Sequence, residues 1–205
     1  MRRTKEEAAR TRRAIVEAAL ACFDRHGIAN TTLDQIAEQA RVTKGAVYWH
    51  FSGKAEILHA IRRESSLLLL DRADCTLLDA AELSPLDRVQ RLLEGMLETI
   101  EKDARTRTAV TVMQYKCEYA GSLEAELQDM RRNNARLTKS LEQVYSEARK
   151  SGELAPGLTP RVAALDTMVF LAGLVRLSLL DRTRDGVRRN VKSLIRNHVR
   201  SRRAR

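Results

Sequence analysis

Residues 42 to 54 hold the densest group of side chains with a recognisable chemistry. The segment reads Val-Thr-Lys-Gly-Ala-Val-Tyr-Trp-His-Phe-Ser-Gly-Lys, and three of the eight aromatic residues of the chain fall within four positions of it. At about 100° per residue, Val47 and Phe51 share one face of a short helix, while Gly45 and Trp49 point roughly the opposite way. A helix anchored by Val47 and Phe51 therefore presents aromatic and basic groups outward, and the best candidate for their partner is DNA.

The residues before this segment predict the rest of a helix-turn-helix. Thr32 and Gln35 have the spacing of a capping box, which marks a helix start. This helix ends at Arg41, a three-residue joint follows, and Thr43 can cap the next helix. Apolar residues at helical spacing complete the pattern: Leu33, Ile36, Ala37 and Ala40 in this helix, and Ile15, Ala19, Cys22 and Phe23 in a longer first helix that stops at Gly27. Three helices can bury these faces together.

Several small or polar residues of this region suit particular contacts with DNA. Thr31 and Thr32 lie at a helix N-terminus, where exposed N–H groups and the helix dipole favour a phosphate. Lys44 can reach a guanine edge or a phosphate, and Gly45 lets the backbone approach the groove closely. Ala46 offers a methyl contact to thymine.

The remaining contacts are assigned to the DNA backbone. Tyr48 and His50 can form hydrogen bonds with phosphates, Trp49 can contact a phosphate or a sugar, and Lys54 can bind a phosphate beside the next helix. Structural roles stay open for the same positions: Tyr48 as a packing residue, Lys54 as a solvated lysine, His50 with little role, and the two threonines as caps alone.

Composition predicts an all-α protein with two domains. The chain has 205 residues, with 9 Gly and 3 Pro, and it lacks alternating β-branched runs. We expect a DNA-binding domain over residues 1–53 and a larger helical ligand-binding and dimerisation domain over 54–205. The expected helices after residue 53 span 54–81, 85–102, 104–120, 122–151, 160–181 and 187–202.

The net charge of +10 does not by itself indicate nucleic-acid binding. Residues 186–205 hold eight Arg or Lys and no acid, which leaves +2 for the rest of the chain. Apolar residues keep a helical spacing within this basic tail, which favours a last amphipathic helix with a solvated charged face and a frayed end. The alternative is an auxiliary phosphate contact or a patch that binds an anionic surface.

The sequence shows no signs of a metal site, a cofactor or catalysis. Its histidines (His26, His50, His59 and His198) and its cysteines (Cys22, Cys75 and Cys117) have neither metal-ligand nor triad spacing, and no Gly-rich phosphate loop is present. We expect no enzyme activity, and a reducing cytoplasmic location because no secretory signal is seen. The apolar run 168–180 is too short to span a bilayer and contains Arg176, so we expect a buried helix and no membrane partner.

The motifs described above resemble a known family. Residues 29–37 and 42–51, with Lys54 and Leu58, are similar to the DNA-binding domain of TetR-family repressors, over about residues 3 to 62. The opening segment 3–8 looks in particular like the branch that includes AcrR and TtgR, which represses multidrug efflux pump genes. Segments 103–107, 116–118 and 173–176 are similar to the ligand-binding domains of that branch.

This resemblance implies a large, mainly apolar ligand pocket in the C-terminal domain. Val110 and Ala172 stand where the pattern of the branch places polar residues, so the pocket should be less polar, with Gln114 and Arg176 as polar handles. The residues expected to line it by similarity are Leu92, Leu93, Met96, Val110, Met113, Gln114, Cys117, Leu137, Leu141, Met168, Leu171, Val175 and Arg176. Several of them must be core residues, because a packed core has the same periodicity.

The expected function is that of a ligand-responsive repressor. A homodimer would bind a palindromic operator of double-stranded DNA, control a multidrug efflux operon and be released by hydrophobic drugs. Helices 122–151 and 160–181 are long and apolar on more than one side, so they are expected to form the four-helix dimer interface. Two alternatives stay open: a structural or division-control DNA-binding protein without an inducer, and a repressor that senses redox state through Cys117.

Overall fold

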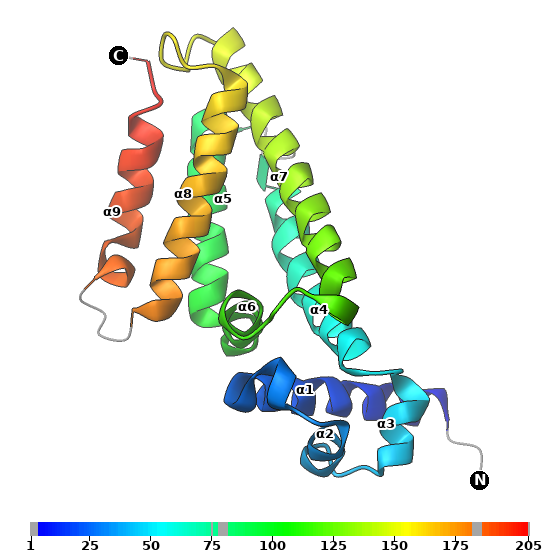
Figure 1. Cartoon of the computed structure of the whole chain (residues 1–205). Coiled ribbons are helices and arrows are strands. Elements are labelled where there is room, and N and C mark those ends of the chain that lie inside the picture. Colours follow the sequence, from blue (N-terminus) through cyan, green and yellow to red (C-terminus); the bar gives the residue numbers. More distant parts are fainter. Residues whose placement is uncertain (1–3, 75, 78–81, 182–185, 205) are drawn as a thin grey trace. The chain divides into compact units, whose positions relative to one another are not determined.

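The chain folds into helices, as expected. The computed structural model describes residues 4–74, 76–77, 82–181 and 186–204, and within them the only β pairing is an isolated bridge between Leu154 and Arg203. Figure 1 shows the α-helices: α1 (Lys5–Asn30), α2 (Leu33–Gln39), α3 (Lys44–His50), α4 (Lys54–Asp74), α5 (Pro85–Lys102), α6 (Ala104–Tyr115), α7 (Glu124–Lys150), α8 (Pro160–Leu180) and α9 (Val187–Arg200). The expected helix over 54–81 ends at Asp74 in the described part, and residues 78–81 lie outside it.

Two compact units make up the chain. The first contains Met1–Ser66 and Ala104–Leu127, and the second contains Leu67–Asp103 and Gln128–Arg205. This division does not coincide with the expected boundary after residue 53. The physical reason is that Ile57 and Ile61 of α4, and Val112 of α6, are buried in the same apolar cluster as the first three helices.

Helix caps and one glycine set the ends of the first helices. Thr4 caps α1 in a capping box with Glu7, and Thr32 caps α2 in a second capping box with Gln35. Gly27 has φ 77° and ψ 162°, so it breaks the helical path of α1 at the residue where the sequence predicts the helix to stop. The α1 face that carries Ile15, Ala19 and Phe23 is fully buried.

Ion pairs attach α6 to the other helices of the first unit. Arg105 pairs with Glu17 of α1 at 2.6 Å and with Glu64 of α4. The Lys116 ammonium lies 3.1 Å from the Asp24 carboxylate. These contacts place α6 within the same structural unit as the helix-turn-helix.

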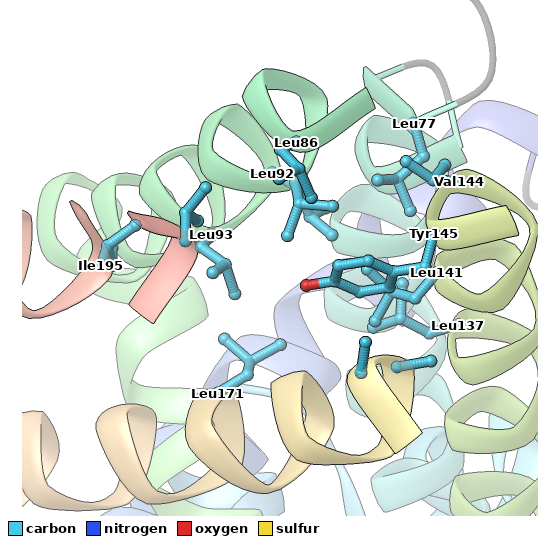
Figure 2. Close-up of a cluster of buried hydrophobic side chains, with 14 of the residues drawn as sticks. Leu77, Leu86, Leu92, Leu93, Leu137, Leu141, Val144, Tyr145, Leu171 and Ile195 are labelled. Atoms are coloured by element: carbon cyan, nitrogen blue, oxygen red, sulfur yellow. The ribbon is translucent and has the colours of Figure 1, made fainter. Parts of the chain in front are cut away.

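The second unit surrounds a core built by α5, α7, α8 and α9. Ser84 caps α5 ahead of Pro85, and Thr159 caps α8 ahead of Pro160, both as the sequence predicts. Figure 2 shows Leu93, Leu171 and Tyr145 pointing toward one another from α5, α8 and α7.

The C-terminal segment is docked onto the second unit. The Ala155 N–H donates to the Arg202 carbonyl, and the Ala204 N–H donates to the Glu153 carbonyl, both at 2.8 Å. Arg202 is 6% exposed and pairs with Asp166 of α8. The expectation of a frayed end is therefore wrong through residue 204, because this segment pairs with the loop between α7 and α8.

Candidate nucleic-acid interface

The turn between α2 and α3 is built by backbone geometry and caps. Arg41 adopts φ 55°, a left-handed conformation that is uncommon for a residue with a side chain. The Val42 N–H then donates to the Ala37 carbonyl at 3.0 Å, and the Thr43 hydroxyl accepts from the Ala46 N–H at 3.2 Å. The tight turn fixes the direction in which α3 leaves α2.

One face of α3 is anchored in the apolar core of the first unit. Val47 is 0% and Phe51 is 1% exposed. The guanidinium carbon of Arg12 lies 4.8 Å from the centre of the Phe51 ring, a cation–π contact that ties α1 to the end of α3. This arrangement agrees with the inward face expected from helical periodicity.

The opposite face of α3 presents aromatic side chains to solvent. Tyr48 is 53% and Trp49 is 71% exposed, and the His50 ring meets the Trp49 ring edge-on at a centroid distance of 4.4 Å. A Cβ added at Gly45 would meet only the Thr43 hydroxyl, at 3.9 Å. Packing within the chain therefore does not require glycine at position 45, whereas close approach of an external surface would favour it.

Lys44 lies on the exposed surface, but an acid holds its ammonium. The Nζ atom is 2.8 Å from a carboxylate oxygen of Asp34, and both side chains are more than half exposed. The hydrogen bond and negative charge of Asp34 raise the pKa of Lys44. A contact of Lys44 with DNA would therefore compete with this ion pair.

Two expected phosphate contacts have internal partners in the structure. Thr31 is 1% exposed, and its hydroxyl donates to the carbonyls of Gly27 at 2.7 Å and Cys22 at 3.3 Å. The Lys54 ammonium donates to the carbonyls of Ile28 at 2.7 Å and Ala29 at 3.0 Å. The Thr31 hydroxyl is thus withdrawn from the surface, and Lys54 ties the start of α4 to the end of α1.

Two other expected contact residues remain accessible. Thr32 is exposed at the start of α2, where its hydroxyl accepts from the Gln35 N–H at 3.2 Å. Ala46 is half-buried beside Val47. Six of the nine expected DNA-contact residues therefore belong to α3, and Thr32 is the exposed N-cap of α2.

Comparison with known families decides the class of this protein. Residues 15–61 match the model of the bacterial regulatory proteins of the tetR family, and residues 84–201 match that of the C-terminal region of MAATS-type transcriptional repressors. The chain belongs to the TetR family. The resemblance of the motifs and the all-α fold are therefore confirmed, and the families matched are those of transcriptional regulators rather than enzymes.

Similar proteins include repressors of efflux pumps. The chain is 35% identical over 181 residues to the transcriptional regulator TtgR of Pseudomonas putida, and the match covers 88% of this chain and 85% of TtgR. The structure of NalD, the secondary repressor of the MexAB-OprM multidrug efflux pump in Pseudomonas aeruginosa, matches with a TM-score of 0.83 at 26% identity, over 97% of this chain and 98% of NalD. A complex of SmeT with triclosan matches with a TM-score of 0.79 at 26% identity, over 93% of this chain and 90% of SmeT. This TetR-family chain is a transcriptional repressor that resembles efflux pump repressors.

The residues expected to line a ligand pocket are divided between the two units. Val110, Met113, Gln114 and Cys117 belong to the first unit. In the second unit, Leu92, Leu93, Leu137, Leu141 and Leu171 are buried in the core, and Met96, Met168 and Val175 pack against it. The exposed Gln114 and Arg176 are the two residues expected to be polar handles.

Arg176 lies on the outer face of α8. It follows Val169 by seven residues and precedes Leu180 by four, so helical geometry places these three side chains on one face. Val169 is 72% and Leu180 is 56% exposed, whereas Leu171 on the opposite face is buried. The role of Arg176 as a polar handle of the ligand pocket stays a prediction.

A row of hydrogen-bonded polar side chains in the core of the second unit was not predicted from the sequence. The Tyr145 side chain is fully buried, and its hydroxyl lies 2.7 Å from the Thr167 hydroxyl. Thr167 also lies 3.0 Å from Nε2 of His198, whose ring stacks on Phe170. Tyr145 follows Leu141 by one helical turn, so its place on the buried face could have been found from the apolar stripe of α7.

The outer face of α8 carries large aliphatic side chains. Those exposed by 44% to 72% are Val162, Leu165, Val169, Leu177 and Leu180. In α7, by contrast, Leu137, Leu141 and Val144 are buried within the unit, and no large apolar side chain is exposed in its described part. The expectation that both helices are apolar on a second face therefore holds for α8 but not for α7.

By length and composition alone, α8 could cross a membrane. Its mean hydropathy over 18 residues is 1.8, and 33% of that window is buried. The expectation of a buried helix is correct only for its inner face. The protein belongs to a family of DNA-binding regulators, so we expect another protein surface to cover the outer face of α8.

The two cysteines in the described residues lack the properties of redox sensors. Cys22 is buried and Cys117 is half-buried, and burial raises the pKa of both thiols. The nearest expected cation, Lys116, is paired with Asp24. Because the thiolate is the reactive form, this environment does not favour redox sensing through Cys117.

Proposed function

We propose that this TetR-family repressor binds a palindromic operator as a homodimer in the cytoplasm, and that a hydrophobic small molecule releases it. The operon it controls would encode a multidrug efflux pump. The observation that carries the proposal is the outward face of α3, where Tyr48 and Trp49 are exposed on a capped helix-turn-helix. The relatives that repress efflux pumps support the class of operon.

The DNA contacts would be centred on α3. Gly45 and Ala46 would approach base edges, and Tyr48, Trp49 and His50 would contact phosphates and sugars. Lys44 would exchange Asp34 for a phosphate or a guanine edge. Thr32 would contribute at the start of α2, and Lys54 would act mainly by fixing α4 to α1.

The outer face of α8 supports dimerisation. Its aliphatic side chains carry no hydrogen-bonding groups, so contact with the same face of a second copy would remove apolar area from water. A dimer would hold its two α3 helices about 34–36 Å apart, one turn of DNA.

The inducer site would use the apolar interior of the second unit. Leu92, Leu93, Leu141 and Leu171 supply apolar surface there, and the Tyr145 hydroxyl supplies a polar group (Figure 2). A ligand held mainly by area burial fits hydrophobic drugs of different shapes. The complex of SmeT with triclosan is a precedent in a similar protein.

Release would follow from coupling between the inducer site and the operator. The helix α4 has residues in both units, so a displacement of α4 would change how the α3 helices are presented. A 100-fold loss of operator affinity needs about 2.7 kcal/mol of coupling free energy. By linkage, the operator must weaken inducer binding by the same factor.

The decisive experiment measures binding of the purified protein to the DNA upstream of its own gene and of the divergent neighbour. We expect tight, salt-sensitive binding that at least one compound from a panel of hydrophobic drugs reverses. Binding that no compound reverses would favour the alternative of a DNA-binding protein without an inducer. No binding to either promoter would contradict the proposed operator.

A second experiment tests the proposed interior site. Leu171→Ala should change the order in which the drugs release the operator, because it removes apolar contact area from the site. Leu194→Ala is the matched control, since the same side chain is removed from an exposed position of α9 in the same unit. An unchanged drug order in Leu171→Ala would place the inducer elsewhere.

A further inference from the structure

The last helix of the second unit has one strongly basic face. Arg189, Lys192, Arg196 and Arg200 of α9 are spaced so that, at about 100° per residue, they fall within an arc of about 80°. Ile195 and Val199 point into the core. All four basic residues are exposed, and they lie on the side of the helix away from Leu194.

The C-terminal half of this face borders a groove between α5 and α9. The groove has a volume of about 440 Å³ and is lined by Gln90 of α5 and by Ser193, Arg196, Asn197, Val199, Arg200 and Arg203. Three guanidinium groups and three neutral polar side chains therefore share one small concave surface. The helices α5 and α9 of the second unit are in contact.

The two central arginines of the groove have no acidic partner among the described residues. Arg196 donates to the Ser193 hydroxyl at 3.4 Å, and Arg200 donates to the Asn197 side-chain oxygen at 3.1 Å. Arg203 differs, because its guanidinium pairs with Asp87 at 2.7 Å and with Glu153 at 3.0 Å. Arg203 is therefore fixed in place while Arg196 and Arg200 present unneutralised charge.

The other end of the same helix pair shows a different balance of charge. There, Glu94, Glu98 and Glu101 of α5 line a pocket together with Arg188, Arg189 and Lys192. Acids and bases thus share that end of the α5–α9 pair. The groove around Arg196 and Arg200, by contrast, has no acidic residue in its lining.

We propose that this groove binds a small organic anion that carries a phosphate or diphosphate group. Arg196 and Arg200 are one helical turn apart, so their side chains can reach the same anion. Each planar guanidinium can donate two parallel hydrogen bonds to phosphate oxygens. Gln90, Ser193 and Asn197 add neutral groups that can hydrogen-bond to the remaining oxygens.

The shape of the site favours a small molecule over duplex DNA. A volume of about 440 Å³ lies in the range of small-molecule sites, and the arginines line a concavity rather than a projecting helix. This polar site is separate in chemistry from the apolar interior proposed for the inducer. The protein would therefore bind a second ligand, an anion, at a site different from that of the inducer.

The test is calorimetric titration of the full-length protein with pyrophosphate at matched ionic strength. We expect saturable binding that the double variant R196Q/R200Q weakens at least about tenfold, since two charge-assisted contacts are lost. The control K139Q/K150Q removes two exposed positive charges from α7 of the same unit and should bind as the parent does. Glutamine preserves helix propensity, and a thermal melt verifies folding; should the double variant unfold, R200Q alone gives the same test.

Three results would overturn the proposal. The first is an absence of saturable pyrophosphate binding, and the second is an equal loss in both double variants, which would indicate unspecific charge attraction. The third is citrate binding as tightly as pyrophosphate, which would indicate recognition of carboxylates. If R196Q/R200Q instead weakens binding to operator DNA while pyrophosphate does not bind, the arginines contact the DNA backbone.

Discussion

In the part of the chain that the structure describes, α3 and α8 each expose more than one large hydrophobic side chain, but the chemistry of the two faces differs. On α3, the large side chains that are exposed are Tyr48 and Trp49, and each carries a hydrogen-bond donor; the same helix also carries the exposed ammonium of Lys44. On α8, the large hydrophobic side chains that are exposed are all aliphatic, from Val162 to Leu180, with the charged Arg176 among them. Exposure alone therefore does not identify a partner. The donors on α3 suit a polyanion, whereas the aliphatic face of α8 suits another apolar surface.

The two helices also differ in how the rest of the chain supports them. The seven residues of α3 are held by two buried side chains, Val47 and Phe51, and by the cap at Thr43. The inner face of α8 is fixed by burial of Leu171 and Leu174 and by the hydrogen bonds of Thr167. A short helix on a rigid base can present a surface to DNA, and a long, well-supported helix can carry a dimer interface.

The largest effect is expected from a charge on the outer face of α8. Val169→Asp would bury an unpaired carboxylate in the proposed interface, so the protein should become monomeric. A monomer presents one α3 helix rather than two, and operator affinity should fall at least about 100-fold. Sedimentation analysis and DNA binding measure the two effects on the same sample.

The matched control for this change lies on α7. Lys139→Asp places the same side chain at an exposed position of α7, where no large hydrophobic side chain is exposed among the described residues, and it should leave the dimer intact. Because Val169 is 72% exposed in the single chain, the variant should keep its helical circular dichroism. A folded Val169→Asp dimer would remove α8 from the interface.

A smaller effect is expected from the face of α3. Tyr48→Phe and Lys44→Ala should each weaken operator binding about tenfold, since each removes one contact to DNA worth roughly 1–3 kcal/mol. Both proteins should remain dimers, which separates this defect from that of Val169→Asp. Operator affinity measured at several salt concentrations checks the result.

The ion pair of Lys44 provides a sharper version of the same test. Asp34→Asn removes the carboxylate that competes for the ammonium, so operator binding should stay equal or become tighter. Weaker binding in Asp34→Asn would mean that the pair itself orients α3. Unchanged affinity in both Tyr48→Phe and Lys44→Ala would contradict the assignment of α3 as the recognition helix.

Sequence alone predicts the helices and their caps because these depend on local chemistry. Thr32, Thr43, Ser84 and Thr159 all cap the helices that the sequence predicts. The buried face of α3 follows from periodicity, which places Val47 and Phe51 together. Local spacing is enough for both inferences.

Partners distant in sequence explain the failures. Lys54 donates its internal hydrogen bonds to the carbonyls of Ala29 and Ile28, which lie 25 and 26 positions earlier in the sequence. Arg202 is buried because Asp166, 36 positions earlier, meets it in the docked C-terminal segment. The side of α8 that faces the core is also set by packing, and similarity to a family segment does not give it: Leu171 is buried, whereas Arg176 is exposed.

The smallest effect is expected from acid, which should lower the stability that His198 gives to the packing of α8. Burial and the nearby charge of Arg202 lower the pKa of His198 to about 4, although Asp166 acts in the opposite direction. The folded protein therefore holds His198 neutral, stacked on Phe170, while the unfolded chain takes up a proton near a pH of about 6.5. Stability from this group is fully present above about pH 6.5 and is lost as the pH falls toward about 4.

We expect this loss to be roughly 1–2 kcal/mol after allowance for the partial exposure of the ring. Urea unfolding of the parent and of His198→Gln at pH 7 and pH 5 measures it, because the variant should lose less stability on acidification. His26→Gln, at an exposed position of α1, is the control and should behave as the parent does. If acid lowers the free energy of unfolding of His198→Gln as much as that of the parent, the His198 imidazole does not make the packing of α8 sensitive to pH. The outer faces of α3 and α8 would then differ in their side-chain chemistry but not in the pH dependence of their support.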